Sequence, residues 1–142
     1  MRRVGRHAFQ VDISSGVPDG GAHLDSHADT SVGGENFMLL SDPSSITTYA
    51  DVAPFLDSYA PISNVPIATC ATAYTCPDTG EVFVLIFHQM LYFGDKMTHS
   101  LLCPNQLRYA GHQVHDCPRQ FDMASKHGIT FRAVNGTLFV PL

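Results

Sequence analysis

A short stretch at residues 25–29 places two carboxylates among small and polar groups. Asp25 follows Leu24, and the chain continues Ser26-His27-Ala28-Asp29. A carboxylate at the corner between a strand and a loop is a candidate general acid or base. Taken alone, such an aspartate is more often a turn residue that hydrogen-bonds its own backbone. The order of the neighbouring residues therefore decides between the two interpretations.

That order resembles the active-site motif of aspartic proteases, in which an apolar residue is followed by Asp, Ser or Thr, Gly and then Ala. Four of the five positions of Leu24-Asp25-Ser26-His27-Ala28 fit, and retroviral-type enzymes often have an Asp where Asp29 stands. A second region is similar to the second half of copia-type retrotransposon proteases, in the order Leu91-Tyr92-Phe93, Ser100 to Leu107, and Gly111. The resemblance extends from about Leu24 to Val114. It implies a retropepsin-like domain of a retrotransposon polyprotein.

The resemblance implies peptide hydrolysis by two carboxylates that share one proton. Like charges about 3 Å apart cannot both ionise, so one pKa of such a pair rises and the other falls. The ionised member takes a proton from water while its partner protonates the carbonyl oxygen of the peptide. This chain holds one such motif, so the second carboxylate has to come from a second copy. A twofold homodimer is expected.

The resemblance also assigns roles around Asp25, the catalytic carboxylate. Ser26 would donate its hydroxyl across the twofold axis, Ala28 and Asp29 would line the cleft, and Asp29 would contact the substrate backbone. The tip of a flap that closes over a peptide or polyprotein substrate and excludes water is expected at Cys76, Pro77, Asp78, Thr79 and Gly80. The resemblance implies no cofactor and no metal.

His27 departs from the family pattern, which has glycine at this position because a bare backbone lets substrate approach closely. An imidazole adds bulk there, and when protonated it can hold both carboxylates ionised, which opposes catalysis. The ring can also project away harmlessly, bind a ligand or sense pH. One alternative is therefore a retropepsin-like domain that dimerises or binds peptide without cleaving it. Cys103 also replaces a glycine of many retroviral-type enzymes, but copia-type sequences commonly carry a small serine there.

A less favoured alternative is a small zinc-binding module that uses His112, His115 and Cys117. These residues offer ligand atoms, but a structural zinc site takes four ligands, usually in closely spaced pairs. The spacing of the cysteines matches no strong zinc pattern. In an intracellular setting they are expected to remain thiols: Cys70, Cys76, Cys103 and Cys117.

The composition is that of one folded domain over residues 1–142, with 44% hydrophobic and 15% charged residues. A net charge of −5 provides no basic field for nucleic acid. No apolar run reaches the roughly 18 residues that cross a membrane, and no apolar segment of a secretory signal follows the basic start. We therefore expect an intracellular, cytoplasmic domain, or one within virus-like particles, that binds neither nucleic acid nor membrane.

The elements that position these residues are predicted to be mostly strands. Apolar–polar alternation predicts a strand over 8–13, a loop rich in Gly follows over 14–21, and a short strand leads into Asp25. Two runs rich in β-formers, 65–74 and 81–93, flank the turn at 76–80 and predict a long hairpin.

Further strands and one helix are predicted beyond this hairpin. Residues 100–102 read as a strand, 104–110 as a short helix that begins with Pro, and 129–140 as a hairpin around Asn135-Gly136. Ser41-Asp42-Pro43 predicts a turn, and Tyr49–Tyr59 an irregular helix or loop. The expected fold is a retropepsin-like closed β-barrel, half of an acid protease, with a flap hairpin and one short helix. Its motif-bearing core spans about 24–114.

Overall fold

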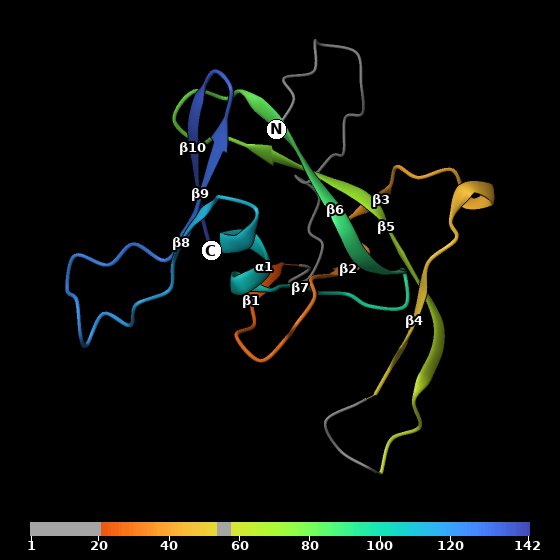
Figure 1. The fold of residues 1–142 in the computed structure, drawn as a ribbon. Coiled ribbons are helices and arrows are strands. Elements are labelled where there is room, and N and C mark those ends of the chain that lie inside the picture. Colours follow the sequence, from red (N-terminus) through yellow and green to blue (C-terminus); the bar gives the residue numbers. More distant parts are fainter. Residues whose placement is uncertain (1–20, 54–57) are drawn as a thin grey trace.

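The computed structural model describes residues 21–53 and 58–142. Strand accounts for 48% of these residues and helix for 8%, which confirms a mostly β class with one short α-helix in the described part. The predicted strand over 8–13 and most of the loop after it lie outside the described residues. The elements, shown in Figure 1, are β1 (Ala22–Leu24), β2 (Val32–Gly34), β3 (Met38–Leu39), a 3-10 helix (Pro43–Ser45), β4 (Tyr49–Val52), β5 (Ile62–Thr75), β6 (Val82–Gly94), β7 (Ser100–Leu102), α1 (Pro104–Tyr109), β8 (Gln113–His115), β9 (Gly128–Ala133) and β10 (Gly136–Pro141).

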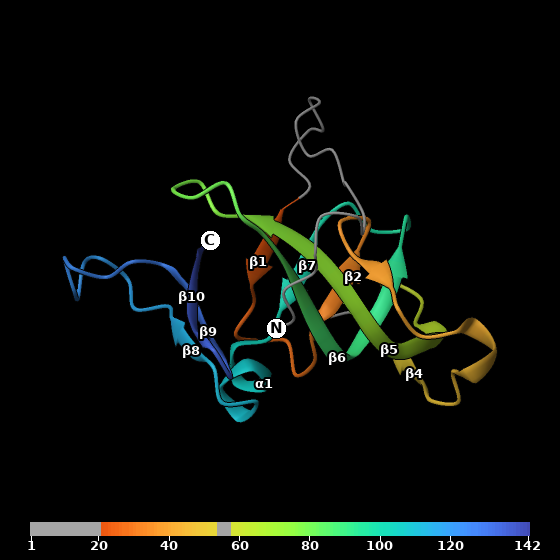
Figure 2. The ribbon, with the colours of Figure 1, turned by 90° about the horizontal axis from the view of Figure 1, so that it is seen from above.

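Two sheets form the fold. The larger has the order β1-β7-β2-β6-β5-β3, with β4 also paired to β5, and the smaller has the order β10-β9-β8. The path of the larger sheet begins at β1 and ends at β3, so over the described residues it does not close into the expected barrel. Figure 2 shows the long, twisted β5 and β6 crossing the molecule, with the smaller sheet to one side.

The long hairpin predicted from two β-rich runs is confirmed as β5 and β6, which pair antiparallel from Ile67↔Leu91 to Thr75↔Val82. The turn between them is closed by two hydrogen bonds of 2.8 Å, from Gly80 N–H to Cys76 O and from Cys76 N–H to Glu81 O. Gly80 has φ +68°, a conformation that glycine adopts without a Cβ clash. The turn chemistry of the sequence therefore placed the hairpin correctly.

The prediction of an irregular helix or loop over Tyr49–Tyr59 is wrong at its start, where β4 forms. β4 pairs antiparallel with the beginning of β5, with Ala50 opposite Val65 and Val52 opposite Ile62. Four residues are too few to show strand periodicity, so their conformation is set by the long neighbouring strand. The turn predicted at Ser41–Pro43 becomes the start of the 3-10 helix, capped by Asp42, whose side chain accepts the Ser44 N–H.

The core joins the two sheets. Phe87 of β6 packs edge to face against Phe37 at a centroid distance of 5.3 Å and against Phe131 of β9 at 6.0 Å. Met90 and Ile129 are 0% and 1% exposed beside them. The C-terminal hairpin, predicted from Asn135-Gly136 and confirmed as β9 and β10, therefore shares one core with the motif-bearing region. No helix in the described part of the chain is long and apolar enough to cross a membrane.

Candidate functional site

The loop that carries Asp25 begins where β7 lies between β1 and β2. β1 pairs parallel with β7, with Leu24 opposite Leu102, and β2 pairs antiparallel with the same strand, with Val32 opposite Leu101. The Asp25 N–H donates to Leu102 O at 3.0 Å, which extends the β1–β7 ladder into the loop. β7, about 75 residues later in the chain, thus lies between β1 and β2, the two strands that flank the Asp25 loop. The segment around Asp25 and the segment at Ser100 to Leu107 are therefore in direct contact.

Ser31 fixes the far end of the loop through three hydrogen bonds. Its side chain is buried, and its hydroxyl oxygen accepts the Cys103 N–H at 3.0 Å. Its own N–H donates to the side-chain oxygen of Gln106 at 2.9 Å, and its carbonyl accepts the Leu91 N–H at 2.9 Å. The loop of residues 25–30 is therefore held between β7, α1 and β6. Neither Ser31 nor Gln106 was predicted as a site residue, because no local pattern marks a contact between residues so far apart in sequence.

The helix that follows β7 is confirmed at Pro104–Tyr109, with Pro at its first turn. Cys103 is its N-cap and is 1% exposed, and its sulfur accepts the Gln106 N–H at 3.4 Å. The Gln106 side-chain amide also donates to Gln89 O at 3.1 Å, where β6 has a positive φ of 57°. The small side chain of Cys103 thus fits the buried start of α1, at a position where copia-type sequences commonly have a small serine.

The Asp25 carboxylate lies on a tight turn and remains accessible. Its Oδ1 accepts the backbone N–H of His27 at 2.9 Å, and its carbonyl accepts the N–H of Ala28 at 3.3 Å. The side chain is 35% exposed. The carboxylate is therefore oriented by its own loop, and solvent or a ligand can reach it.

The His27 side chain projects into solvent beside this carboxylate. It is 96% exposed, and its Nδ1 lies 4.0 Å from Asp25 Oδ1. Ser26 and Asp29 are also exposed, whereas Ala28 is half-buried. The five predicted site residues of the loop thus surround one small surface, and the imidazole is the largest group on it.

The predicted flap tip, by contrast, lies far from Asp25. On β6, Leu91 hydrogen-bonds to Ser31 at the end of the Asp25 loop. Val82, at the other end of β6 beside the turn, lies nine residues before Leu91. At about 3.3 Å per residue, roughly 30 Å of strand separates them. Figures 1 and 2 both show the green turn well away from the orange loop after β1. The structure therefore does not bring Cys76, Pro77, Asp78, Thr79 and Gly80 together with the catalytic candidate.

The turn has its own local chemistry. Hydrogen bonding by the Thr79 side chain and by the backbone of Thr79 and Asp78 lowers the pKa of the Cys76 thiol below its usual value. Cys70, buried in the core, has the opposite environment, and desolvation raises its pKa to about 11. The pKa values of these two thiols are thus shifted in opposite directions, and neither thiol lies in the Asp25 loop.

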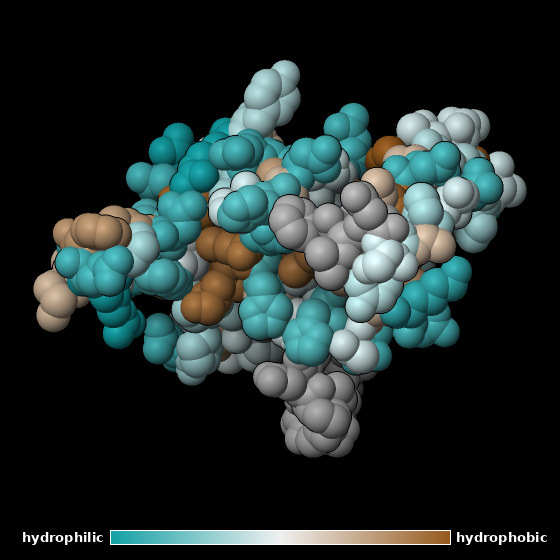
Figure 3. Space-filling view, turned by 90° about the horizontal axis from the view of Figure 1, so that it is seen from below, coloured by the Kyte–Doolittle hydropathy of each residue, from teal (hydrophilic) through white to brown (hydrophobic). Residues whose placement is uncertain are grey.

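The end of β5 that pairs with β4 carries exposed apolar side chains. In Figure 1 the paired strands β4 and β5 extend towards the bottom of the view. At that end, Tyr59 is 64% exposed and Ile62 is 50% exposed. Seen from below, this face carries an apolar patch surrounded by hydrophilic side chains (Figure 3).

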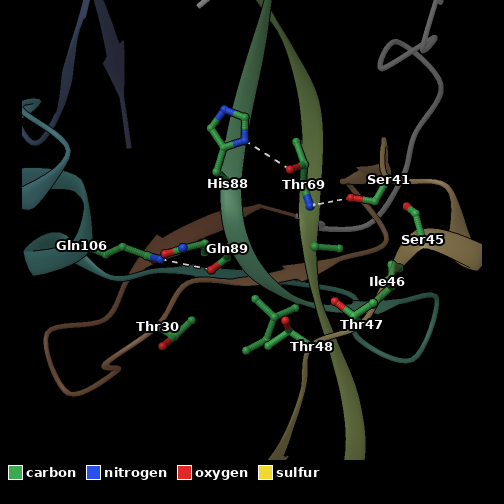
Figure 4. A pocket seen from close by; sticks show the side chains of 12 residues that line it. Thr30, Ser41, Ser45, Ile46, Thr47, Thr48, Thr69, His88, Gln89 and Gln106 are labelled. Carbon is green, nitrogen blue, oxygen red and sulfur yellow. Dashed lines mark hydrogen bonds between the residues drawn. The ribbon is translucent and has the colours of Figure 1, made fainter.

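A groove of about 510 Å³ adjoins the loop beyond Asp29. Its wall mixes apolar side chains, those of Ile46, Ile67 and Ala68, with uncharged polar ones, and Figure 4 shows its hydroxyl, amide and imidazole groups around a common space. The His88 Nδ1 and the Thr69 hydroxyl interact across one side of it at 3.1 Å. Its lining includes Thr30, Ser41, Ser45, Thr47, Thr48, Thr69, His88, Gln89 and Gln106.

The residues of the zinc alternative have other partners. His112 Nδ1 accepts the backbone N–H of Arg132 at 3.2 Å, and burial lowers the pKa of its ring. The His115 Nε2 and the Thr130 hydroxyl interact at 2.9 Å. Within residues 21–53 and 58–142, no three His, Cys, Asp or Glu side chains gather as metal ligands. The arrangement of His112, His115 and Cys117 therefore does not favour zinc.

Comparisons of the chain with protein-family models, with curated proteins and with solved structures find no match. Functional inference consequently depends on the geometry of the Asp25 loop and on the motifs of the sequence.

Proposed function

We propose that this chain supplies one half of an aspartic endopeptidase of the retrotransposon type, which hydrolyses peptide bonds and processes a polyprotein. The observation that carries the proposal is the contact between the two motifs. The same family resemblance singled out both segments, which lie about 75 residues apart in the sequence, and they meet through the hydrogen bonds from Asp25 N–H to Leu102 O and from Cys103 N–H to Ser31 Oγ. A chance match at Asp25 would not require residues 100–107 to support the same loop.

In the proposed reaction, the Asp25 carboxylates of two copies face each other and share one proton. One Oδ1 is already oriented by the His27 N–H, so the carboxylate needs little reorganisation to take a proton from the attacking water. The partner carboxyl protonates the carbonyl oxygen, and the tetrahedral intermediate then releases the amine as the proton passes to nitrogen. The half-exposed carboxylate and its single motif per chain are both consistent with a site completed by a second copy.

The closing arm in this proposal is the β4–β5 hairpin rather than the turn at Cys76–Gly80. The exposed Tyr59 and Ile62 give its end an apolar surface, which suits contact with a peptide or with the second copy.

His27 favours a second candidate, a domain of the same fold that dimerises or binds peptide without cleaving it. The exposed ring stands 4.0 Å from the carboxylate, in the space that a substrate would enter. If the ring blocks that space in the dimer, peptides can still bind along the loop and the arm, but hydrolysis fails.

Cleavage of a peptide library, followed by mass spectrometry, tests the proposal. We expect Asp25→Asn to abolish cleavage, because the amide cannot take a proton from water, while its circular dichroism and unfolding midpoint match the wild type. Asp78→Asn, an exposed aspartate on the distant turn, is the matched control and should cleave normally. Equal activity of the Asp25→Asn protein and the wild type would show that the activity belongs elsewhere. A wild-type dimer that binds peptides but never cleaves them would favour the second candidate.

A further inference from the structure

The Asp25 loop holds two metal-ligating side chains on one surface. The Asp25 carboxylate is 35% exposed, the His27 ring is 96% exposed, and the distance between Oδ1 and Nδ1 is 4.0 Å. The only contact made by this carboxylate in the described structure, besides the ring, is the backbone N–H of His27 to Oδ1. The carboxylate and the imidazole are therefore both accessible to a ligand.

One chain alone provides an incomplete ligand set. Within the part of the chain that the structure describes, no third His, Cys, Asp or Glu approaches closely enough to form a metal site. Two ligands leave a tetrahedral cation half coordinated. A twofold axis beside Asp25, as the proposed peptidase requires, doubles the set to two carboxylates and two imidazoles.

We infer that two copies of this chain bind one divalent cation of the zinc class between their Asp25 and His27 side chains, and that this cation inhibits the peptidase. The inference rests on the proposed function, because the site needs the same dimer. The cation would ionise both carboxylates and occupy the position of the attacking water. No carboxyl proton would then remain for the carbonyl oxygen of the substrate.

The geometry requires only a small movement. Zinc binds imidazole nitrogen at about 2.0–2.1 Å and carboxylate oxygen at about 2.0–2.2 Å. Two such ligands on a tetrahedron lie roughly 3.4 Å apart, so the 4.0 Å between Nδ1 and Oδ1 has to shorten by less than 1 Å. The exposed His27 ring can rotate by that amount without displacing any packed side chain. Mixed nitrogen and oxygen ligands favour Zn²⁺ or Co²⁺ over Ca²⁺ and Mg²⁺, which prefer oxygen alone.

Titration of the untagged, chelator-stripped protein with Zn²⁺ by calorimetry, and with Co²⁺ by visible absorption, tests the inference. We expect one metal ion per two chains, with the intense absorption of tetrahedral Co²⁺, and a loss of peptidase activity as the zinc site fills. His27→Gln should abolish the Co²⁺ absorption and the zinc inhibition together. The matched control is His23→Gln, since His23 is also exposed, lies two residues on the other side of Asp25, and packs its ring 5.4 Å from that of His99.

The outcomes separate this inference from the proposed function. An Asp25-dependent, dimeric peptidase that binds no zinc, binds one zinc per chain, or loses zinc with His23→Gln and not with His27→Gln overturns the metal site alone. A stripped wild-type protein that is monomeric and cleaves no peptide overturns the proposed function, and the metal site with it. Zinc-dependent activation of cleavage would also overturn the inference, because it would assign the cation to catalysis rather than to inhibition.

Discussion

Replacing Ser31 with alanine tests whether the Asp25 loop is held by the buried contact between the two motifs. The change leaves both backbone hydrogen bonds of residue 31 in place, to Gln106 and to Leu91. It removes only the hydroxyl oxygen that accepts the Cys103 N–H at 3.0 Å. Because Ser31 and Cys103 are 2% and 1% exposed, water cannot readily replace the lost acceptor.

The expected loss of stability follows from this burial. A buried donor left without a partner costs about 1–3 kcal/mol, and in a domain of this size each kcal/mol lowers the melting temperature by roughly 3 °C. We therefore expect the melting temperature of Ser31→Ala to fall by about 3–9 °C. Urea unfolding, followed by circular dichroism, should give the same free-energy difference with an unchanged m-value.

Ser26→Ala is the control, because Ser26 is exposed on the same loop and its loss should change stability by less than about 0.5 kcal/mol. A loss of that small size for Ser31→Ala would refute the reasoning, since it would mean that the Cys103 N–H has another partner or that the loop does not depend on it. The function should respond as well. In an active protein, Ser31→Ala should also lower cleavage, because the loop beside Asp25 loses one of its two contacts with the start of α1.

Three further predictions concern His27, the glycines at 34 and 80, and His112. His27→Gly should raise peptidase activity above that of the wild type. If the ring blocks the site sterically, the gain should appear at every pH, and if its charge interferes, the gain should appear mainly at acidic pH. No gain anywhere in the pH–rate profile would mean that the ring does not obstruct the site. Gly34→Ala should lower the free energy of unfolding in urea by about 1–3 kcal/mol, because a Cβ there would lie 2.7 Å from the His99 carbonyl oxygen. Gly80 has open space around it, so Gly80→Ala should lower the free energy of unfolding by only about 1 kcal/mol. Burial lowers the pKa of His112 from 6.5. The stability that the neutral ring contributes is therefore full above about pH 6.5 and is lost as the pH falls through the lower pKa of the folded state. His112→Gln should flatten this part of the profile of unfolding free energy against pH, and an unchanged profile would contradict the role given to His112.

Local signals in the sequence predicted the elements that local chemistry determines. The short strand before Asp25, the helix that begins with Pro104 and the hairpin around Asn135-Gly136 formed where turn and capping residues placed them. β4 and β8 were missed because strands of three or four residues have no readable period and form by pairing with β5 and β9.

The position of the hairpin relative to the site could not be read from its turn. Cys76–Gly80 shows that a hairpin turns there, but not which end of the hairpin faces Asp25. That choice is made by the parallel pairing of β2 with the far end of β6, at Val32↔Leu91. The contact of Ser31 with Gln106 has the same origin, since it joins residues 75 positions apart and only the folded topology brings them together.

The placement of β7 between β1 and β2 also determines when the candidate site can form during synthesis. Loop closure over about 75 residues is slow compared with closure of the local hairpins, because distant pairings pay the chain entropy before any contact offsets it. Consider a nascent chain whose β5–β6 hairpin has left the ribosome while residues 100–107 have not. Its Asp25 N–H then lacks β7, the strand to which it donates a hydrogen bond. The carboxylate loop therefore cannot make this contact on the ribosome until β7 and the start of α1 have been released. A protease encoded within a polyprotein would, by this folding order alone, stay inactive until its own chain was complete through α1.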